Sequence, residues 1–193
     1  GSLIQPNAVP GDVKFEDVNG DGKIDADNDR INIGKGIPDW VFGLNLGFEW
    51  KGIDFSMLLQ GQYGVQTFNV TRRTDLYYIN LPKSILNRWT GEGTTNSQPR
   101  FTYDGGANEN YRTSNLWLED ASFIRARNVQ LGYTFPVSLT SKIGIERLRI
   151  FAQAENLFTL TKYPLYDPEV SSNTLFDRGI DGLYQTAPAI NAR

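Results

Sequence analysis

The segment from Trp40 to Trp50 constrains the fold more than any other part of the sequence. Its even positions carry Trp, Phe, Leu, Leu, Phe and Trp, whereas its odd positions carry Val, Gly, Asn, Gly and Glu. Successive strand side chains point to opposite faces, so the alternation predicts a strand with one apolar face and one small or polar face. About ten residues at ~3.3 Å rise, tilted by roughly 40°, cover about 25 Å, the height of the apolar band of an outer-membrane barrel. Soluble strands usually have about five or six residues, so a membrane strand is favoured over an amphipathic strand of a soluble sandwich.

Three further segments alternate in the same way. Lys51-Gly52 predicts a tight turn into a second strand over Ile53–Tyr63, where only Leu58 breaks the pattern. A third strand is predicted over Ser122–Phe135 and a fourth over Arg147–Phe158. We therefore expect four antiparallel strands of membrane-spanning length.

Two arginines interrupt the apolar face expected for the third strand. Arg125 and Arg127 occupy the same alternate positions as Val129, Leu131 and Tyr133. An arginine on the lipid face at mid-depth costs about 2–4 kcal/mol. We expect this end of the strand to lie above the hydrocarbon.

The connections between the strands alternate in length. Residues 51–52 and 136–146 form short connections, whereas a long one covers residues 64–121 and about 35 residues follow the fourth strand. Such alternation is typical of the periplasmic and extracellular ends of an outer-membrane barrel, and long structureless loops are uncommon in soluble domains. The sequence therefore predicts an all-β, antiparallel part of a large transmembrane β-barrel with long extracellular loops. We expect an extracellular loop region at 1–38 and barrel strands and loops at 39–193.

Both ends of the chain suggest a piece of a longer protein. It begins Gly-Ser-Leu with no initiator Met and no signal region, and it stops at Ala192-Arg193 with no closing strand. Four strands cannot close a barrel, because the smallest kind has about eight. We expect the missing strands to lie outside these residues.

The composition excludes several functions. The chain has no Cys and no His, which removes disulfides, thiolate metal sites and nucleophile–His catalysis. A net charge of −3 and a pI near 5.0 argue against a nucleic-acid partner. Carboxylate pairs exist at Glu119-Asp120 and at Asp167 and Glu169, but adjacent strand acids point to opposite faces and the second pair flanks Pro168, where a turn is the simpler account. We expect no enzymatic activity.

The acidic segment at residues 17–29 has the spacing of a calcium loop. Oxygen ligands at alternate positions around Gly22 can wrap a hard cation, although Asn28 stands where the final bidentate acid belongs. The alternative is a turn stabilised by its own Asp and Asn side chains. The predicted ion is a structural Ca²⁺, and its predicted ligands are Asp17, Asn19, Asp21, Lys23 through its carbonyl, Asp25 and Asp29.

A set of motifs in fixed order resembles the C-terminal barrel portion of SusC/RagA-type TonB-dependent outer-membrane transporters. The matching stretches are Gly11–Phe15 with the acidic segment, Pro38-Asp39 before Trp40, Lys51–Phe55 with Gln60-Gly61, Asp120–Arg125, Leu131–Tyr133, Ala154–Phe158 and Tyr166–Val170. The resemblance implies a barrel of about 22 strands with an N-terminal plug in the bacterial outer membrane. It also implies import of glycans or peptides with a SusD-like surface lipoprotein, driven by TonB through the N-terminal part that these residues lack.

The resemblance suggests roles for several aromatic residues. Trp40, Trp50 and Tyr133 would anchor the barrel at the membrane interfaces in contact with outer-membrane lipid. Candidate substrate contacts on the long loops are Tyr77, Tyr78, Trp89 and Trp117, although we expect most loop aromatics to pack the loops together. The alternative function is a secreted β-rich carbohydrate-binding module with a structural calcium, which a folded, monodisperse protein in detergent-free buffer would favour.

Overall fold

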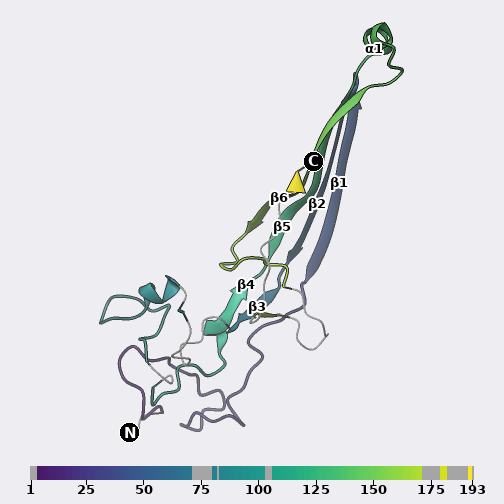
Figure 1. Cartoon of the computed structure of the whole chain (residues 1–193). Helices are drawn as coiled ribbons and strands as arrows, with labels where there is room; N and C mark the ends of the chain where they lie inside the picture. Colours follow the sequence, from purple (N-terminus) through teal and green to yellow (C-terminus); the bar gives the residue numbers. More distant parts are fainter. Residues whose placement is uncertain are drawn as a thin grey trace. The chain divides into compact units, whose positions relative to one another are not determined.

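The chain is an antiparallel β protein with little helix. The computed structural model describes residues 4–70, 80–81, 83–102, 106–170, 179–181 and 191–192. Strands make up most of the regular structure (Figure 1). The predicted all-β, antiparallel fold class is confirmed. Among the described residues, no helix is long and apolar enough to cross a membrane.

Five strands form the large sheet, in the order β1-β2-β5-β6-β8. They are β1 (Trp40–Trp50), β2 (Ile53–Tyr63), β5 (Phe123–Thr134), β6 (Arg149–Thr161) and β8 (Asn191–Ala192). The first two begin and end where the alternation predicts, whereas β6 starts two residues later than expected and continues to Thr161. Every pairing in this sheet is antiparallel.

A two-residue turn joins β1 to β2 and sets their register. Lys51 and Gly52 both have positive φ, 48° and 88°. Two consecutive left-handed residues match the right-handed twist of a hairpin. The register therefore pairs Trp50 with Ile53 at the turn and Trp40 with Tyr63 at the far end.

Arg127 is an extra residue in β5. Leu58 faces Asn128 and Leu59 faces Ala126, so Arg127 has no register partner on β2. Such a β-bulge shifts the alternation by one residue. Arg125 consequently lies opposite Gln60 on the polar face of the sheet.

The bulge corrects one prediction. Arg125 and Arg127 do not share the face of Val129, because Ala126 and Ile124 continue that face beyond the bulge. The physical reason is the cost of an arginine among apolar side chains, about 2–4 kcal/mol in a bilayer.

The smaller elements lie in the connections. A three-stranded sheet has the order β4-β3-β7, with β4 at Leu118–Asp120, β3 at Gln66–Asn69 and β7 at Ile180–Asp181. Helix α1 (Val137–Thr140) occupies the connection between β5 and β6. Within the described residues, short 3-10 helices cover Lys83–Asn87, Asn115–Trp117 and Ser141–Ile143.

The chain divides into two compact units. One contains residues 1–34 and 68–118, and the other contains residues 35–67 and 119–193. This division places the long connection at 68–118 with the N-terminal segment, whereas the sequence suggested a boundary after residue 38. We call the first the loop unit and the second the sheet unit.

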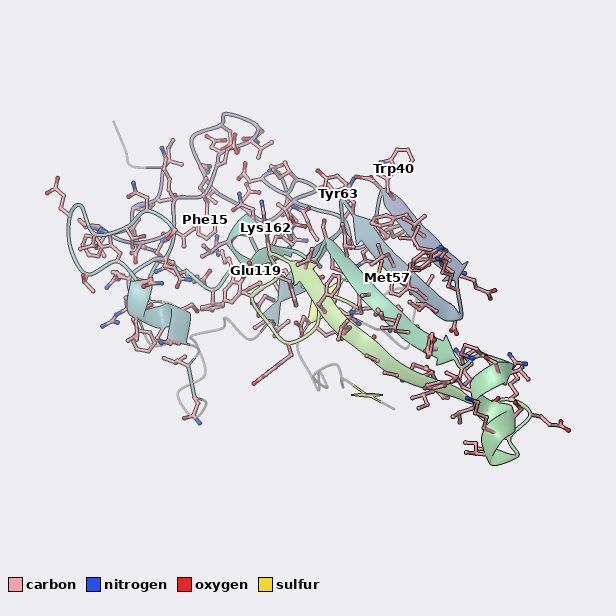
Figure 2. The ribbon with its side chains drawn as sticks, turned by 90° about the horizontal axis from the view of Figure 1, so that it is seen from above. Phe15, Trp40, Met57, Tyr63, Glu119 and Lys162 are labelled. Carbon is pink, nitrogen blue, oxygen red and sulfur yellow. The ribbon has the colours of Figure 1, made fainter. Side chains whose placement is uncertain are left out.

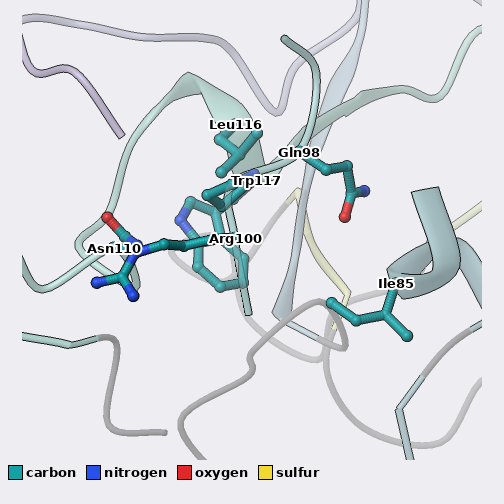
Figure 3. A pocket seen from close by; sticks show the side chains of 7 residues that line it. Ile85, Gln98, Arg100, Asn110, Leu116 and Trp117 are labelled. Carbon is teal, nitrogen blue, oxygen red and sulfur yellow. The ribbon is translucent and has the colours of Figure 1, made fainter. Parts of the chain in front are cut away.

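A buried carboxylate holds the loop unit together. The Asp12 side chain is 1% exposed, and its Oδ1 accepts hydrogen bonds from Arg100 Nε at 2.6 Å and Asn110 Nδ2 at 2.8 Å. Burial raises the pKa of Asp12, but hydrogen bonds from Arg100, the Val9 amide and Asn110 outweigh it, so the pKa lies below its usual value. Arg100 and Asn110 also line a pocket of about 30 Å³ beside Trp117 (Figure 3). That volume suits one water molecule and no larger ligand.

We predict that Asp12→Asn lowers the free energy of unfolding of the loop unit by about 2 kcal/mol at pH 7, because it leaves Arg100 without its buried partner. Because the pKa of Asp12 is lower in the folded protein than in the unfolded chain, ionised Asp12 stabilises the fold at pH values above the ordinary pKa of an aspartate. This stabilisation is lost as the pH falls through the lowered pKa of the folded protein. The difference from wild type should therefore shrink below about pH 4. Proteolysis of the loop unit across pH measures both effects.

The matched control is Glu109→Gln, which removes an exposed ion pair with Arg112 in the same unit. It should change stability by about 0.5 kcal/mol or less. Equal effects of the two substitutions would contradict the assigned role of Asp12.

Candidate functional site

One face of the large sheet is apolar and exposed. Register rows across four strands contain only apolar, aromatic or glycine residues, such as Leu46, Met57, Val129 and Ala154 at mid-strand. In the part of the chain that the structure describes, the β1 side chains on this face stay open to solvent: Trp40 71%, Phe42 41%, Leu44 50%, Leu46 41%, Phe48 56% and Trp50 62%. A contiguous apolar patch of this kind marks a surface that meets lipid or a protein partner.

Aromatic residues lie at both ends of this face. Trp40 and Tyr63 are register partners at one end, and Figure 2 shows both there. Trp50 lies at the other end in the same register row as Ile53 and Tyr133. Trp40, Trp50 and Tyr133 thus lie on the apolar face at its two ends, and their membrane-interface role stays a prediction.

The opposite face is polar, and an ion pair crosses it near the hairpin turn. Arg149 of β6 reaches over β5 to Asp54 of β2, with Nε 3.0 Å from Oδ1. The pair passes over Gly132, where an added Cβ would lie 2.6 Å from both side chains. Because Gly132 has no side chain, the ion pair can join β2 to β6 across the intervening strand β5.

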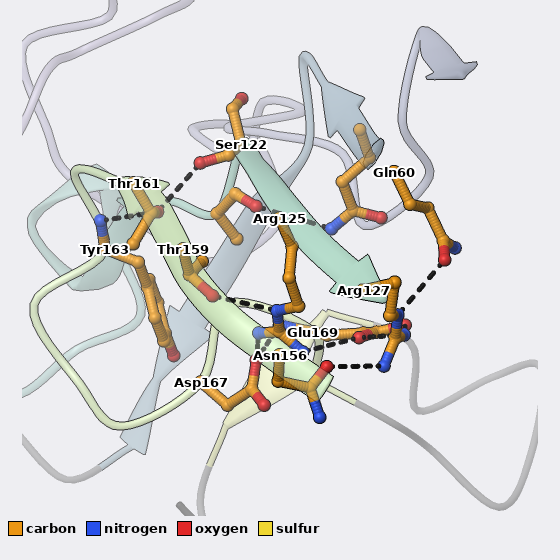
Figure 4. Close-up of polar contacts among 12 residues, drawn as sticks. Gln60, Ser122, Arg125, Arg127, Asn156, Thr159, Thr161, Tyr163, Asp167 and Glu169 are labelled. Carbon is orange, nitrogen blue, oxygen red and sulfur yellow. Dashed lines mark hydrogen bonds and ion pairs between the residues drawn. The ribbon is translucent and has the colours of Figure 1, made fainter. Parts of the chain in front are cut away.

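A buried arginine forms the centre of a second charge network on this face (Figure 4). Arg125 is 2% exposed, and its Nη2 lies 2.5 Å from Asp167 and its Nη1 3.0 Å from Glu169. Its Nε donates to Thr159 Oγ1 at 2.9 Å. A buried arginine needs such paired and hydrogen-bonded surroundings, because desolvation of an unpaired charge costs several kcal/mol.

Arg127, the bulge residue, completes this network. Its Nη2 donates to both carboxylate oxygens of Glu169 at 2.6 Å, and its Nε donates to Gln60 Oε1 at 3.1 Å. Nη1 donates to Asn156 Oδ1 at 3.4 Å. We call Arg125, Arg127, Asp167 and Glu169 the charge clamp.

The acidic segment forms a self-bonded turn. Asp17 accepts hydrogen bonds from the amides of Gly20, Asp21 and Gly22 at 2.7 to 3.2 Å. Further amides donate to Asn19, Asp21, Asp25 and Asp29. Hydrogen bonds from Asn28 hold the pKa of Asp25 below its usual value. For Lys23, the predicted calcium ligand is the backbone carbonyl oxygen and not the side chain.

No three acidic side chains of the described residues gather as a metal-binding group. The turn matches the alternative reading of this segment, and calcium binding by the predicted ligands stays a prediction. Carboxylate oxygens that already accept amides keep further lone pairs, so the donor chemistry still suits Ca²⁺.

The candidate substrate-contacting aromatics fall into two groups. Tyr77 and Tyr78 lie outside the described residues. Trp117 is 4% exposed, its Nε1 donates to the Arg112 carbonyl at 2.9 Å, and its ring stacks on Phe68. Trp89 is half-buried, and its ring lies where a Cβ on Gly11 would be. The packing of these two residues agrees with the expectation that most loop aromatics hold the loops together, and contact with substrate stays a prediction.

Sequence reasoning missed the charge clamp. Strict alternation puts Arg125 on the apolar face, and Asp167 and Glu169 look like parts of a turn. The one local signal was Leu58, which breaks the alternation of β2 where the register shifts.

The curated proteins that resemble this chain are named as TonB-dependent receptors. No protein-family model matches the chain. It is 33% identical over 168 residues to "TonB-dependent receptor P39" of Formosa agariphila, a match that covers 84% of this chain and 16% of the relative. "TonB-dependent receptor SusC" of Bacteroides thetaiotaomicron is 27% identical over 172 residues, covering 88% of this chain and 16% of that protein. The chain thus spans about a sixth of the curated relatives it matches.

Solved structures of the RagAB peptide importer are also similar to this chain. The RagAB peptide importer in its "closed-closed" state matches with a TM-score of 0.62 at 29% identity, covering 90% of this chain and 19% of that one. Its "open-open" state also matches with a TM-score of 0.62, at 26% identity over 86% of this chain and 18% of that one.

We predict that Gly132→Ala breaks the bridge between Asp54 and Arg149, since the new Cβ would overlap both side chains. The added Cβ meets only the far ends of two flexible side chains, so we expect the ion pair to be lost, the strands to stay in place and the unfolding temperature to fall slightly. Thermal unfolding measures the effect. Gly43→Ala is the matched control, because its Cβ would meet nothing closer than 3.9 Å. Similar losses in both variants would contradict the role of Gly132.

We also predict that Ca²⁺ binds the acidic segment with saturable heat in calorimetry and raises the unfolding temperature. A ligand at 100-fold excess over its Kd stabilises by about 2.7 kcal/mol. Asp17→Asn with Asp21→Asn should abolish both signals, while Asp39→Asn, outside the segment, should retain them. No heat and no thermal shift with wild type would disprove calcium binding.

Proposed function

This chain is a relative of the SusC/RagA-type TonB-dependent transporters, and from that premise we propose that it forms barrel wall and surface loops in an outer-membrane importer. On this proposal the chain is the C-terminal part of a barrel of about 22 strands. The observation that carries the proposal is the exposed apolar face with aromatic residues at both ends.

The sheet meets the main requirement for crossing a bilayer. Lipid offers no hydrogen-bond partners, so spanning strands must satisfy their backbone groups through neighbouring strands. The backbone groups of β1, β2, β5 and β6 pair with those of neighbouring strands along the stretch between the aromatic residues at the two ends of the apolar face. The remaining edges would pair with strands outside these residues.

The polar face would line the lumen. Its rows carry amide and hydroxyl side chains, such as Ser56, Gln130 and Gln153, which suit a water-filled interior. The charge clamp and the pair of Asp54 with Arg149 lie on the same face. Charges in these positions would be costly against lipid and are compatible with an aqueous channel.

The relatives support active import with a partner lipoprotein. One relative carries the name SusC, and the structural neighbours are titled as the RagAB peptide importer. We infer that this protein imports peptides or glycans, that TonB energises it, and that a SusD-like lipoprotein covers its mouth. The long connections at 64–121 and 158–189 would face the cell surface, since the short connections lie at the opposite strand ends.

Two other functions fit less well. A secreted carbohydrate-binding module would leave the apolar face in water without a partner. A glycosidase would need free acids, whereas Asp167 and Glu169 are paired with arginines and the named relatives are receptors and importers.

We predict that Leu46→Arg in the full-length protein prevents barrel assembly, because the guanidinium would lie at mid-depth in lipid at a cost of about 2–4 kcal/mol. Asn45→Arg is the matched control, because the adjacent position lies on the polar face opposite Leu58. The measurement is the amount of heat-modifiable protein in outer-membrane preparations. Equal assembly of both variants, or folded protein in detergent-free buffer, would refute the membrane assignment.

Uptake tests the remaining part of the proposal. Cells that produce the full-length protein and its lipoprotein should take up peptides or neutral oligosaccharides, and inactivation of TonB should abolish uptake. Uptake that persists without TonB would contradict active import by this protein.

A further inference from the structure

Residues 163–170 follow β6 and are held against the sheet unit at several points; we call them the strap. Tyr163 is 5% exposed and packs with Val65 and Ala121. Leu165 and Val170 of the strap pack against the same cluster. The Tyr163 hydroxyl also donates a hydrogen bond to the buried Asp181. Both ends of the strap are therefore anchored by apolar contacts.

The charge clamp anchors the middle of the strap. Asp167 and Glu169 reach Arg125 and Arg127 of β5, and the Glu169 amide donates to Asp167 Oδ1 at 2.9 Å. Pro168 between them restricts φ to about −65°. The backbone here has little freedom left. The arginines reach it because the bulge places them on the polar face.

The strap carries one strongly exposed aromatic side chain. Tyr166 is 74% exposed, the highest value among the large hydrophobic and aromatic side chains of the described residues. Trp40, Trp50 and Tyr63 are also strongly exposed, but they lie on the apolar face of the sheet. Tyr166 lies between Leu165, which packs against the buried cluster, and Asp167, which pairs with Arg125 of the polar face. Because the backbone on either side of Tyr166 is already held, binding a ligand here requires little further ordering of the chain.

The surrounding chemistry favours an uncharged ligand. The charge clamp itself carries no net charge, because its two arginines are matched by the two strap carboxylates. Two register rows from Arg125, the polar face presents the hydroxyl of Ser56 and the amides of Gln130 and Gln153. Amides that hydrogen-bond hydroxyls, together with a ring that stacks on a sugar face, suit a neutral glycan.

We propose that Tyr166 contacts a neutral glycan as it enters the lumen from the cell-surface end, and that Arg125 and Arg127 are positioning residues that hold the strap. This inference rests on the proposed function, which places the polar face inside the barrel. The ring of Tyr166 stacks on the apolar face of a sugar, and the strap keeps it in place from one transport cycle to the next.

Cysteine accessibility in the full-length transporter with its lipoprotein tests the contact. The 193-residue chain has no cysteine, so Tyr166→Cys introduces a single thiol here. A membrane-impermeant maleimide should label this variant rapidly. A mixture of neutral gluco- and xylo-oligosaccharides should slow labelling at least about five-fold, whereas a tryptic peptide digest should not. Ile37→Cys, just before β1 at the cell-surface end and 66% exposed, is the control whose labelling neither mixture changes.

The outcomes separate this inference from the proposed function. Slow labelling without ligand means that other parts of the transporter cover Tyr166, which overturns the contact. Uptake of oligosaccharides by wild type without protection of the Tyr166→Cys thiol overturns the contact and leaves the importer standing. Protection by peptides alone overturns the glycan assignment. Wild-type cells that take up neither mixture disprove the importer and the contact together.

Transport kinetics test the positioning role. Tyr166→Ala should raise the half-saturating oligosaccharide concentration about five-fold with little change in maximal rate, while Tyr166→Phe should stay within about two-fold. Arg127→Gln should produce the same rise, and the double variant with Tyr166→Ala should add nothing further, because both act through one contact. A lower maximal rate with unchanged half-saturation, or additive effects, would show a structural role alone.

Discussion

A single extra residue allows one sheet to have two chemically opposite faces. Without the bulge at Arg127, strict alternation would place Arg125 among apolar side chains such as Val129 and Leu131. The bulge moves both arginines to the polar face, and the apolar rows continue through Ala126 and Ile124. The cost of an unpaired arginine in an apolar layer exceeds that of a local ladder disruption, so the bulge is the lower-energy solution. The charge clamp, the strap and the uninterrupted apolar face all depend on this residue.

The arginines of the polar face pair with carboxylates of other segments. Arg149 crosses Gly132 to reach Asp54, and Arg125 is held by Asp167, Glu169 and Thr159. Each pair joins segments far apart in the sequence, so it reports tertiary structure and adds to the cohesion of the sheet.

The strands could be predicted from the sequence because their signals are local. Alternation from Trp40 to Trp50 and the Lys51-Gly52 turn determine the first hairpin residue by residue. The bulge could not be predicted, because counting alternate positions assumes a constant period of two. The pairing of Arg125 with Asp167 spans 42 residues, and no local pattern reports such a contact. Short strands such as β3 and β7 have too few residues to show periodicity.

For the candidate site, too, the sequence allowed prediction of the features that depend on local position along a strand, and not of those that depend on distant contacts. Trp40, Trp50 and Tyr133 were identified because strand position alone places them on one face. Tyr166 was not singled out, because its significance comes from the anchors on either side of it. Residues 17–29 have a recognisable spacing, but spacing alone does not decide between a bound ion and a self-bonded turn.

The two-residue turn between β1 and β2 has a consequence for the order in which the sheet assembles. Closing that hairpin confines two residues, whereas pairing β2 with β5 requires closure of a loop of nearly sixty residues. Loop-closure entropy rises with the logarithm of loop length, so the second step is slower and costs more. The first hairpin should therefore form early and serve as a template for β5. A contact within that connection shortens the effective loop: the Ala121 amide donates a hydrogen bond to the Val65 carbonyl at 3.0 Å, so forming it would speed closure as well as stabilise the product.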